Sequence, residues 1–357
     1  MRFFAGLTLL AALVSAGPVA VDISKRNEPL EIVLKRVGNT GIKATLKNAG
    51  DEPLKLFTAG TFLDTAAVEK LTVLSDSQPV PFDGVRLRLA PQKFITDASF
   101  KTLKAGQTVN IELDFAQMHD LGKNTTFEVF ASGGIPYANA GSTKISGVIN
   151  YSSNTLSVKD VDSAKAAFTR LSFHNEIKRT IVQADCTGKN LTAVMAALIN
   201  CQKMARAAAN TAMTDDKRMQ EYFKVSTPEA KQVVFNTFSR VASECSRRDR
   251  GVSKQYCSDV YASCSPGVLA YTVPALKYMV NCPLYFSALP GLTKTCHAQD
   301  QATTTLHEMT HLLQVKGTLD YGIYGYDAIK TLKSAENLNH ADTYCLFANA
   351  VNIGKTC

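Results

Sequence analysis

The first half of this 357-residue chain lacks cysteine, because all nine cysteines lie between Cys186 and Cys357. The second half is therefore suited to an oxidising compartment, in which disulfides form, whereas the first half has nothing to cross-link. A chain of this length is comfortable for two domains, and the uneven cysteine distribution suggests a division near its middle.

Long blocks of lysine and arginine are also missing, although the net charge is +8. A mildly basic chain without such blocks does not imply nucleic acid as a partner. The apolar run from Phe3 to Val14 is too short to span a bilayer, and no later stretch is apolar enough. We therefore expect neither a nucleic-acid partner nor a membrane anchor.

The first residues do contain the three parts of a secretory signal. Arg2 supplies the charged start, Phe3 to Val14 the apolar run, and Ser15 to Gly17 the small residues near a cleavage point. We assign residues 1–19 to a signal peptide and expect a secreted, extracellular product. Three glycosylation sequons fit the same route: Asn124, Asn150 and Asn190.

Residues 20–179 are predicted to be rich in β-strands. Residues 108–115 alternate apolar and polar side chains, and residues 31–36 and 42–48 flank a hairpin-like turn. This half has no pair of histidines, acid cluster or glycine-rich loop that would indicate a site. His119 and His174 are isolated, and a lone histidine is more often structural than a ligand.

The dibasic pair Lys178-Arg179 marks a change of character, because every cysteine and the only pair of closely spaced histidines follow it. We interpret residues 20–179 as a propeptide released by a processing protease at this pair, and residues 180–357 as the mature protein. The alternative is a permanent two-domain protein whose halves are joined by a surface loop.

The second half is predicted to be mainly helical. A helical stripe runs from Leu191 to Met204, and Met204 and Met213 are expected in the core. Thr227 is a candidate N-cap with Pro228 at the first helical position. Residues 334–353 are expected to form a further helix capped by Ser334.

Residues 307–311 read H-E-x-x-H within a helical pattern for which Gly317 is a plausible stop. Residues four apart lie on one face of a helix, so His307 and His311 can bind one ion. Zinc binds imidazole nitrogen, and a catalytic site keeps one position for water, whose pKa falls towards about 7. Glu308 is then placed to act as the general base in the attack on a peptide carbonyl.

A catalytic zinc site needs a third protein ligand. Gly317 lets the chain turn back after the helix, and Asp320 is the first acid that follows. Asp327 comes later, at the expected start of a new helix, where an acid is favoured by the helix dipole.

These segments resemble the deuterolysin family of fungal neutral metalloproteases, the aspzincins. The resemblance rests on H-E-x-x-H at 307–311 followed by G-T-x-D at 317–320, and on the segments 296–311, 268–274 and 340–351. It covers most of residues 180–357, and Thr180 is where a mature chain of the family would begin. The resemblance implies one Zn²⁺ per chain, with ligands His307, His311 and Asp320 and with Glu308 as general base.

The family pattern differs from this sequence at the tyrosine that is expected to bind the oxyanion. Many members have it three residues after the ligand aspartate and before glycine, whereas position 323 is isoleucine here. Tyr324, which precedes Gly325, is the candidate catalytic donor, and Tyr321 is the second choice.

Asp342 matches a second aspartate that some members place beside the zinc site. It is assigned to substrate binding, since it could attract a basic side chain or orient a ligand; the alternative is an acid on a helix surface. His297 and His340 are expected to be structural; the alternative is that they support the residues that bind the metal.

The resemblance also implies three disulfides, Cys186–Cys257, Cys264–Cys282 and Cys296–Cys357. Cys201 and Cys245 lie on two long predicted helices and could pair with each other, which would leave Cys345 as a buried thiol.

We therefore predict an α+β protein, with a mostly helical zincin-type catalytic domain preceded by a β-rich propeptide. The predicted function is that of a secreted zinc metalloendopeptidase, monomeric and made as a preproenzyme. The resemblance implies a preference for basic protein substrates, but residues 180–357 contain more lysine and arginine than acids. Any such attraction must therefore be local, around acids such as Asp342.

Two rival functions are also compatible with the sequence. One is a secreted binding protein that retains an inactive zincin fold, against which the intact Glu308 argues. The other is a metal-dependent hydrolase of another bond, such as an amidase.

Because the propeptide has no cysteine, it cannot block the zinc through a thiolate.

Overall fold

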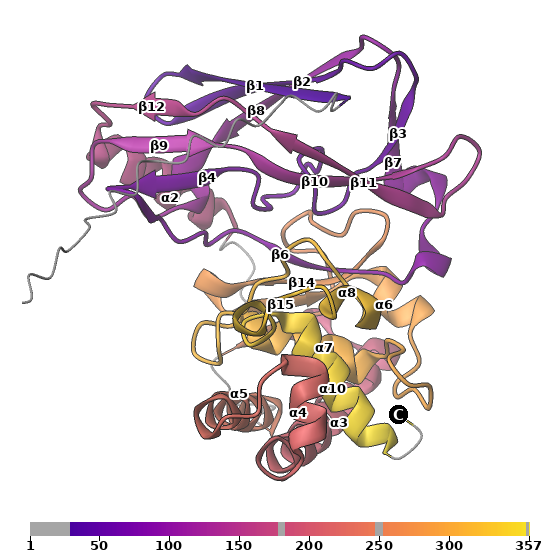
Figure 1. The fold of residues 1–357 in the computed structure, drawn as a ribbon. Coiled ribbons are helices and arrows are strands. Elements are labelled where there is room, and N and C mark those ends of the chain that lie inside the picture. The colour runs from indigo at the N-terminus through magenta and orange to yellow at the C-terminus, as the bar shows by residue number, and fades with distance from the viewer. Residues whose placement is uncertain (1–28, 178–182, 247–252, 355–356) are drawn as a thin grey trace, which may run out of the picture.

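The structure is a computed structural model that describes residues 29–177, 183–246, 253–354 and 357. It contains a β-rich N-terminal region and a mainly helical C-terminal region, which lie against each other (Figure 1). The predicted signal peptide, the Lys178-Arg179 pair and Thr180 lie outside the described residues.

The N-terminal region is built from three antiparallel sheets with the strand orders β1-β2-β8, β11-β10-β3-β7 and β12-β9-β4-β5. Their strands are β1 (Leu30–Val37), β2 (Gly41–Asn48), β3 (Leu54–Phe57), β4 (Thr72–Ser75), β5 (Gln78–Pro79), β7 (Phe100–Leu103), β8 (Thr108–Asp114), β9 (Phe127–Phe130), β10 (Ser132–Ala138), β11 (Ile145–Ser152) and β12 (Leu156–Val158). The predicted hairpin is confirmed, since β1 pairs with β2 from Leu30↔Asn48 to Val37↔Gly41. Side chains along β1 alternate between buried and exposed, and the buried ones enter the core of this region.

Two helices complete the N-terminal region, α1 (Phe115–Met118) and α2 (Ser163–Ile177), together with the 3-10 turns η1 (Gln92–Phe94) and η2 (Asp97–Ser99). His119 is buried and its Nδ1 lies 2.9 Å from the carbonyl of Phe115, as expected for a structural histidine. The side chain of His174 lies outside the described residues.

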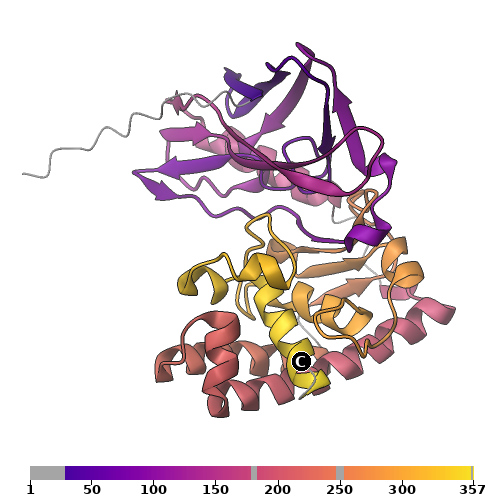
Figure 2. The same ribbon diagram turned by 45° about the vertical axis from the view of Figure 1, so that its right-hand side comes forward.

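The C-terminal region contains most of the helical residues (Figure 2). Its helices are α3 (Gly188–Thr214), α4 (Asp216–Phe223), α5 (Pro228–Ser246), α6 (Pro283–Ala288), α7 (Gln301–His311), α8 (Tyr326–Ile329), α9 (Ser334–Asn337) and α10 (Ala341–Ile353), with 3-10 turns η3 (Gln183–Asp185) and η4 (Pro274–Leu276). Thr227 caps α5 as predicted, because its hydroxyl accepts a hydrogen bond from the N–H of Ala230 at 3.3 Å. The α+β class is confirmed.

The sheet of the C-terminal region includes one strand from the N-terminal region. The order is β13-β15-β14-β6, in which β13 (Lys254–Tyr256), β14 (Val268–Val273) and β15 (Tyr278–Asn281) belong to the C-terminal half. The strand β6 (Arg86–Leu89) pairs antiparallel with β14 at the edge of this sheet. The two regions are therefore joined by backbone hydrogen bonds along the junction in Figure 1.

Two predicted helices end or break earlier than expected. The helix α7 ends at His311, and a short turn separates it from Gly317. The single helix predicted for residues 334–353 is two, because His340 is extended and Leu319 forms a β-bridge with it. The N-cap of α9 is Lys333 rather than Ser334. The break matters because the extended residue His340, just before α10, pairs with Leu319, the residue before Asp320.

One predicted core position on α3, Met213, is wrong. Val194, Leu198, Cys201 and Met204 are buried, but Leu191 is 44% exposed and Met213 is 40% exposed. Both Leu191 and Met213 lie near the ends of this 27-residue helix.

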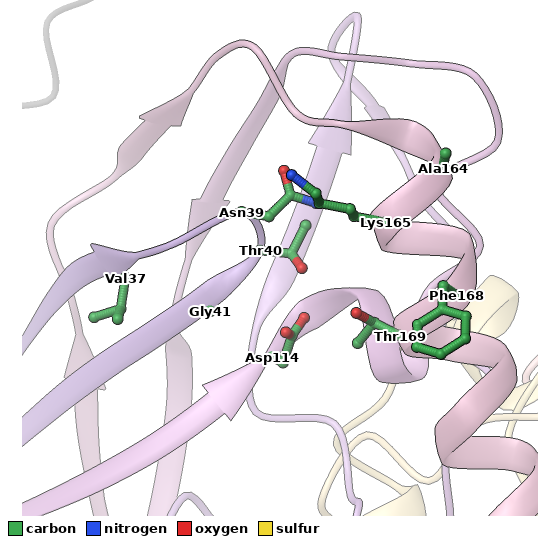
Figure 3. A pocket seen from close by; sticks show the side chains of 9 residues that line it. All are labelled: Val37, Asn39, Thr40, Gly41, Asp114, Ala164, Lys165, Phe168 and Thr169. Atoms are coloured by element: carbon green, nitrogen blue, oxygen red, sulfur yellow. The ribbon is translucent and has the colours of Figure 1, made fainter.

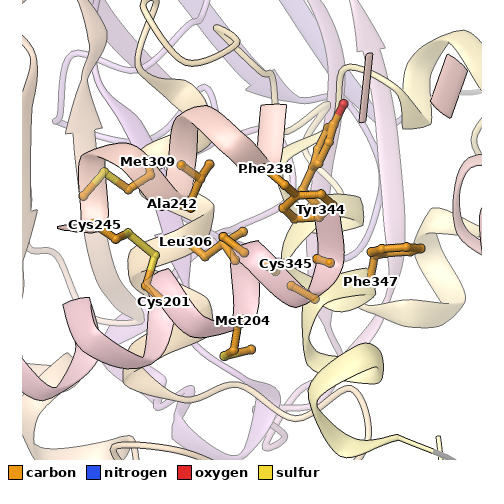
Figure 4. Packing of buried hydrophobic residues seen from close by; sticks show 14 of the residues in the cluster. Cys201, Met204, Phe238, Ala242, Cys245, Leu306, Met309, Tyr344, Cys345 and Phe347 are labelled. Atoms are coloured by element: carbon orange, nitrogen blue, oxygen red, sulfur yellow. A yellow bond between two sulfur atoms is a disulfide. The ribbon is translucent and has the colours of Figure 1, made fainter. Parts of the chain in front are cut away.

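Four disulfides connect the C-terminal region: Cys186–Cys257, Cys201–Cys245, Cys264–Cys282 and Cys296–Cys357. Cys345 is a buried free thiol. Figure 4 shows that Cys201 and Cys245 link α3 to α5 beside Met309 of α7. Among the described residues, no helix combines the length and apolar character that crossing a membrane requires.

Removing the Cys201–Cys245 disulfide should destabilise the C-terminal region. The two residues are separated by 44 positions, so their cross-link restricts a long loop in the unfolded chain. For a loop of this length, we expect the double variant Cys201→Ala/Cys245→Ala to lose about 4 kcal/mol of free energy of unfolding. Denaturant unfolding measures the change; a loss below about 1 kcal/mol would be incompatible with a cross-link that stabilises in this way.

Candidate metal centre

The helix α7 begins at a strong capping box. The carboxylate of Asp300 accepts a hydrogen bond from the N–H of Thr303 at 2.6 Å, and the Thr303 hydroxyl accepts one from the N–H of Asp300 at 3.0 Å. Every residue of α7 is buried. His307 and His311 lie one turn apart on this helix, and their Nε2 atoms are 3.2 Å from each other.

The turn after α7 brings an acid back to the two imidazoles. Gly317 has a φ of +71°, which favours glycine, and its N–H donates to the carbonyl of Thr310 at 3.0 Å. The hydroxyls of Thr310 and Thr318 lie 2.8 Å apart and hold the returning chain against the helix. Asp320 follows directly and points at both histidines.

The three groups have the spacing that a tetrahedral zinc site requires. Asp320 Oδ1 is 3.1 Å from His307 Nε2, and Asp320 Oδ2 is 3.4 Å from His311 Nε2. Ligand bonds of about 2.0–2.1 Å at tetrahedral angles place neighbouring ligand atoms about 3.3 Å apart. The two imidazoles and the carboxylate therefore fit a zinc ion, with one position left for water.

Groups around these three residues fix their orientation. His311 Nδ1 lies 2.8 Å from the carbonyl oxygen of Thr318, and a hydrogen on Nδ1 leaves Nε2 free for a metal. His307 Nδ1 lies 3.6 Å from Asp342 Oδ1. His340 Nε2 lies 3.0 Å from the backbone carbonyl of Asp320, so His340 supports the loop that carries this acid.

The charges of the site are strongly coupled. Burial alone would raise the pKa of Asp320, but the imidazoles of His311 and His307 hold it well below its usual range. Burial and the nearby Arg88 charge lower the pKa of His307, yet the carboxylates of Asp320 and Asp342 raise it well above its usual value. A carboxylate that stays ionised is the form that binds a cation.

Glu308 is fully buried beside the two histidines. Its Oε2 accepts a hydrogen bond from the Thr272 hydroxyl of β14 at 2.6 Å, whereas Oε1 has no hydrogen-bond partner among the described residues. Burial raises the pKa of Glu308, which makes its carboxylate a better proton acceptor. One oxygen is thus anchored and the other is free to take a proton.

Of the two candidate tyrosines, the structure places Tyr324 at the site. Its ring centre is 6.4 Å from that of His307, and burial and Asp320 raise its pKa well above the usual value, so that its hydroxyl stays protonated. Tyr321 is 42% exposed, and its hydroxyl accepts a hydrogen bond from Asn339 at 3.4 Å. The arrangement favours Tyr324 as a hydrogen-bond donor.

The alternative interpretation of Asp342 as a helix-surface acid is wrong, because the residue is fully buried near the start of α10. His297 lies elsewhere, stacked on Tyr326 at 3.7 Å between ring centres. Asp327 is exposed and pairs with Lys330 at 2.6 Å, in the first turn of α8 as predicted. Neither His297 nor Asp327 belongs to the group formed by His307, His311 and Asp320.

Sequence reasoning missed Arg88, which the structure brings to the site from the N-terminal region. Its guanidinium is paired with Asp342, lies 3.0 Å from His307 Nδ1 and 3.6 Å from Cys345 Sγ, and the residue is 1% exposed. Nothing in the local sequence indicates this position, since Arg88 and Asp342 are 254 residues apart. Thr272 was also missed, although it lies in a segment that resembles the aspzincins.

Other cavities and clusters offer weaker sites. A hollow between the β1–β2 turn and α2 (Figure 3) is lined by Asp114 and Lys165, among others. None of the residues that line it belongs to a cluster of possible metal ligands among the described residues. Cys296, His297 and Cys357 are close together, but the two cysteines form a disulfide.

Comparisons with known proteins agree with this chemistry. The family described as "Deuterolysin metalloprotease (M35) family" matches residues 1–355. A "Neutral protease 2 homolog" of Colletotrichum graminicola is 47% identical over 356 residues, which cover 99% of this chain and 100% of that protein. Another, of Phaeosphaeria nodorum, is 48% identical over 345 residues, or 96% of each chain.

A solved structure, "Zinc peptidase from Grifola frondosa", covers 46% of this chain and 96% of its own, with 21% identity and a TM-score of 0.39. The sequence matches, in contrast, include the N-terminal half, for which the motifs had provided no resemblance.

Proposed function

The chain belongs to the deuterolysin metalloprotease (M35) family and is a zinc metalloprotease, and from this premise we propose that His307, His311 and Asp320 hold a single zinc ion. The observation that supports the ligand set is the spacing of 3.1–3.4 Å between their facing ligand atoms. A bound zinc ion lowers the pKa of a water molecule towards about 7 and polarises a carbonyl.

Glu308 is the general base of the proposed mechanism. Its free Oε1 takes a proton from the water that attacks the peptide carbonyl, while Thr272 holds Oε2 in place. The same carboxyl then delivers the proton to the leaving amine. Tyr324 donates a hydrogen bond to the oxyanion that forms, because its hydroxyl is protonated and its ring lies beside that of His307.

The protein is proposed to be a secreted preproenzyme with a signal peptide at 1–19, a propeptide at 20–179 and a catalytic domain at 180–357. The four disulfides of the C-terminal region support passage through an oxidising compartment. A processing protease would cut after Arg179, between α2 and η3. The processed enzyme is proposed to be a monomer.

Basic protein substrates are the proposed preference of the enzyme. Asp342 supports this proposal, because its buried carboxylate already holds one guanidinium, that of Arg88. An arginine or lysine side chain of a substrate would meet the same carboxylate. A net positive catalytic domain makes this attraction local rather than global.

The experiment that tests this function is digestion of a basic and an acidic protein by the processed enzyme, with and without a zinc chelator. We expect cleavage that the chelator abolishes and added zinc restores, and faster cleavage of the basic protein. Binding of proteins without cleavage would favour the inactive binding protein. Hydrolysis of small amides without hydrolysis of proteins would favour the amidase.

Tyr324→Phe should lower kcat by about 10²-fold with little change in KM, because the hydroxyl acts on the transition state. Tyr321→Phe is the matched control and should stay within about twofold of the parent enzyme. Steady-state kinetics on a peptide substrate measure both variants. Equal losses in the two variants, or a loss confined to Tyr321→Phe, would refute the assignment of Tyr324.

A further inference from the structure

The strand β6 occupies the edge of the catalytic sheet that flanks the general base. It runs antiparallel to β14, with Leu87 opposite Tyr271 and Arg86 opposite Thr272. Thr272 is the residue whose hydroxyl binds Glu308. Proteins commonly bind an extended peptide by adding it as a strand to a sheet edge. A segment of the N-terminal region therefore lies where an extended substrate could pair with this sheet.

The backbone of this segment also engages the proposed oxyanion donor. The hydroxyl of Tyr324 donates a hydrogen bond to the carbonyl oxygen of Leu87 at 3.0 Å. A hydroxyl held by one carbonyl is not free for the carbonyl of another peptide. Leu87 thus presents to Tyr324 the same chemical group that a scissile peptide bond would present.

Arg88, the residue after Leu87, fills the space beside His307. Arg88 is among the largest fully buried side chains of the described residues, and its guanidinium contacts Asp342, His307 and Cys345. The carboxylate of Asp342 supplies the negative charge that faces the guanidinium, and the sulfur of Cys345 lies 3.6 Å from it. A buried arginine needs such a partner, since an unpaired buried charge is strongly unfavourable.

Arg86, two residues earlier on the same strand, has a different environment. Its guanidinium pairs with Glu69 of the N-terminal region at 2.6 Å and lies over the ring of Phe82. Both partners belong to the same region as β6. The strand therefore has one arginine that binds its own domain and one that enters the catalytic domain.

We propose that Arg86–Leu89 is a tethered inhibitory strand that occupies the substrate position of the catalytic domain, with Arg88 as its anchor. The inference rests on the proposed function of the histidine–aspartate site. A substrate needs the edge of β14, the hydroxyl of Tyr324 and access to Asp342. The strand β6 pairs with β14, accepts the hydrogen bond of Tyr324 and forms an ion pair with Asp342. No metal-binding cysteine is needed for this block, consistent with the absence of cysteine before Cys186.

The block ends when the N-terminal region leaves. Cleavage at the Lys178-Arg179 pair would make β6 part of a separate chain, so that its contacts are no longer intramolecular. Loss of the tether lowers the effective concentration of the strand at β14 and allows a substrate to compete. Activation is therefore dissociation of a strand and its arginine, rather than replacement of a metal ligand.

The test uses the full chain with Lys178→Ala and Arg179→Ala, so that it remains unprocessed. In this background, Arg88→Met should raise the hydrolysis rate of a small peptide by at least about tenfold, because loss of a buried charged partner weakens a bound segment strongly. Arg86→Met has the same substitution on the same strand and should stay within about twofold. An Arg88→Met protein that is folded but as inactive as its parent would overturn the proposal, as would equal activation by Arg86→Met.

A second measurement covers the case in which Arg88→Met does not fold. Enzyme processed by the secreting host is mixed with a synthetic peptide of residues 82–92, which should inhibit competitively. The peptide carrying Arg88→Met should inhibit at least about tenfold more weakly, whereas the peptide carrying Arg86→Met should inhibit like the parent. No inhibition by the parent peptide, or equal inhibition by all three, would overturn the proposal.

The two experiments separate this proposal from the function on which it rests. Processed enzyme without chelator-sensitive activity would mean that the proposed function is wrong. Active processed enzyme, together with an unprocessed chain that does not respond to Arg88→Met, would mean that the inhibitory strand alone is wrong.

Discussion

Glu308→Gln is expected to lower kcat/KM for peptide hydrolysis by about 10³-fold while the protein retains its zinc. The substitution keeps the size of the side chain and a group that Thr272 can bind, but it removes the carboxylate that accepts the proton. A positioned general base contributes about 10²–10⁴-fold, and Glu308 has one oxygen free for this task. Steady-state kinetics and metal analysis of the same preparation measure the two effects.

The control for this variant is Glu229→Gln, which makes the same change on the exposed first turn of α5. It should keep its activity within about twofold of the parent. Full activity in Glu308→Gln would remove Glu308 from the mechanism. Loss of zinc together with activity would instead mean that Glu308 supports the metal ligands.

Asp320→Asn is expected to lower zinc affinity by more than about 100-fold, because changes in residues that only support a ligand already cost about 10–100-fold. The amide keeps the shape of the side chain but loses the negative charge that lies 3.1 Å from His307 Nε2. Activity should fall with the bound metal and be partly restored by excess zinc. Zinc titration against a competing chelator measures the affinity.

Asp327→Asn is the control for Asp320→Asn, because Asp327 lies seven residues later and its side chain is 93% exposed. Its variant should bind zinc as the parent does. Equal zinc affinity in Asp320→Asn and the parent would show that the third ligand is another residue. A loss in Asp327→Asn alone would transfer the role to that residue.

The arrangement of His307, His311 and Asp320 could be predicted from the sequence because its determinants are local. A helical turn brings the two histidines together, and Gly317 allows the reversal that returns Asp320. The first ligand and the last are thirteen positions apart, and only one turn type is needed between them. Such short-range geometry depends little on the rest of the fold.

The break between α9 and α10 could not be predicted, because the local pattern of residues 334–353 is compatible with one helix. The break follows from a tertiary contact, in which Leu319 accepts a hydrogen bond from the N–H of Ala341 and donates one to the carbonyl of Asn339. The exposure of Leu191 and Met213 could not be predicted either. Helical spacing identifies a face but not how far the neighbouring helices extend along it.

The position of Arg88 depends on the pairing of β6 with β14, which connects segments about 180 residues apart in sequence. The residues L-R-L near 87–89 alternate like any edge strand, and nothing in them indicates which sheet they join. The sequence excludes a blocking cysteine, but the structure is needed to identify the segment that takes its place.

The central claim is that one zinc ion is bound between a turn of α7 and the carboxylate that returns after Gly317. The most direct test is anomalous diffraction at the zinc edge from crystals of the purified protein. We expect one peak at about 2.0–2.2 Å from His307 Nε2, His311 Nε2 and an oxygen of Asp320. A peak bound by other residues, or an Asp320 side chain turned away from the metal, would contradict it.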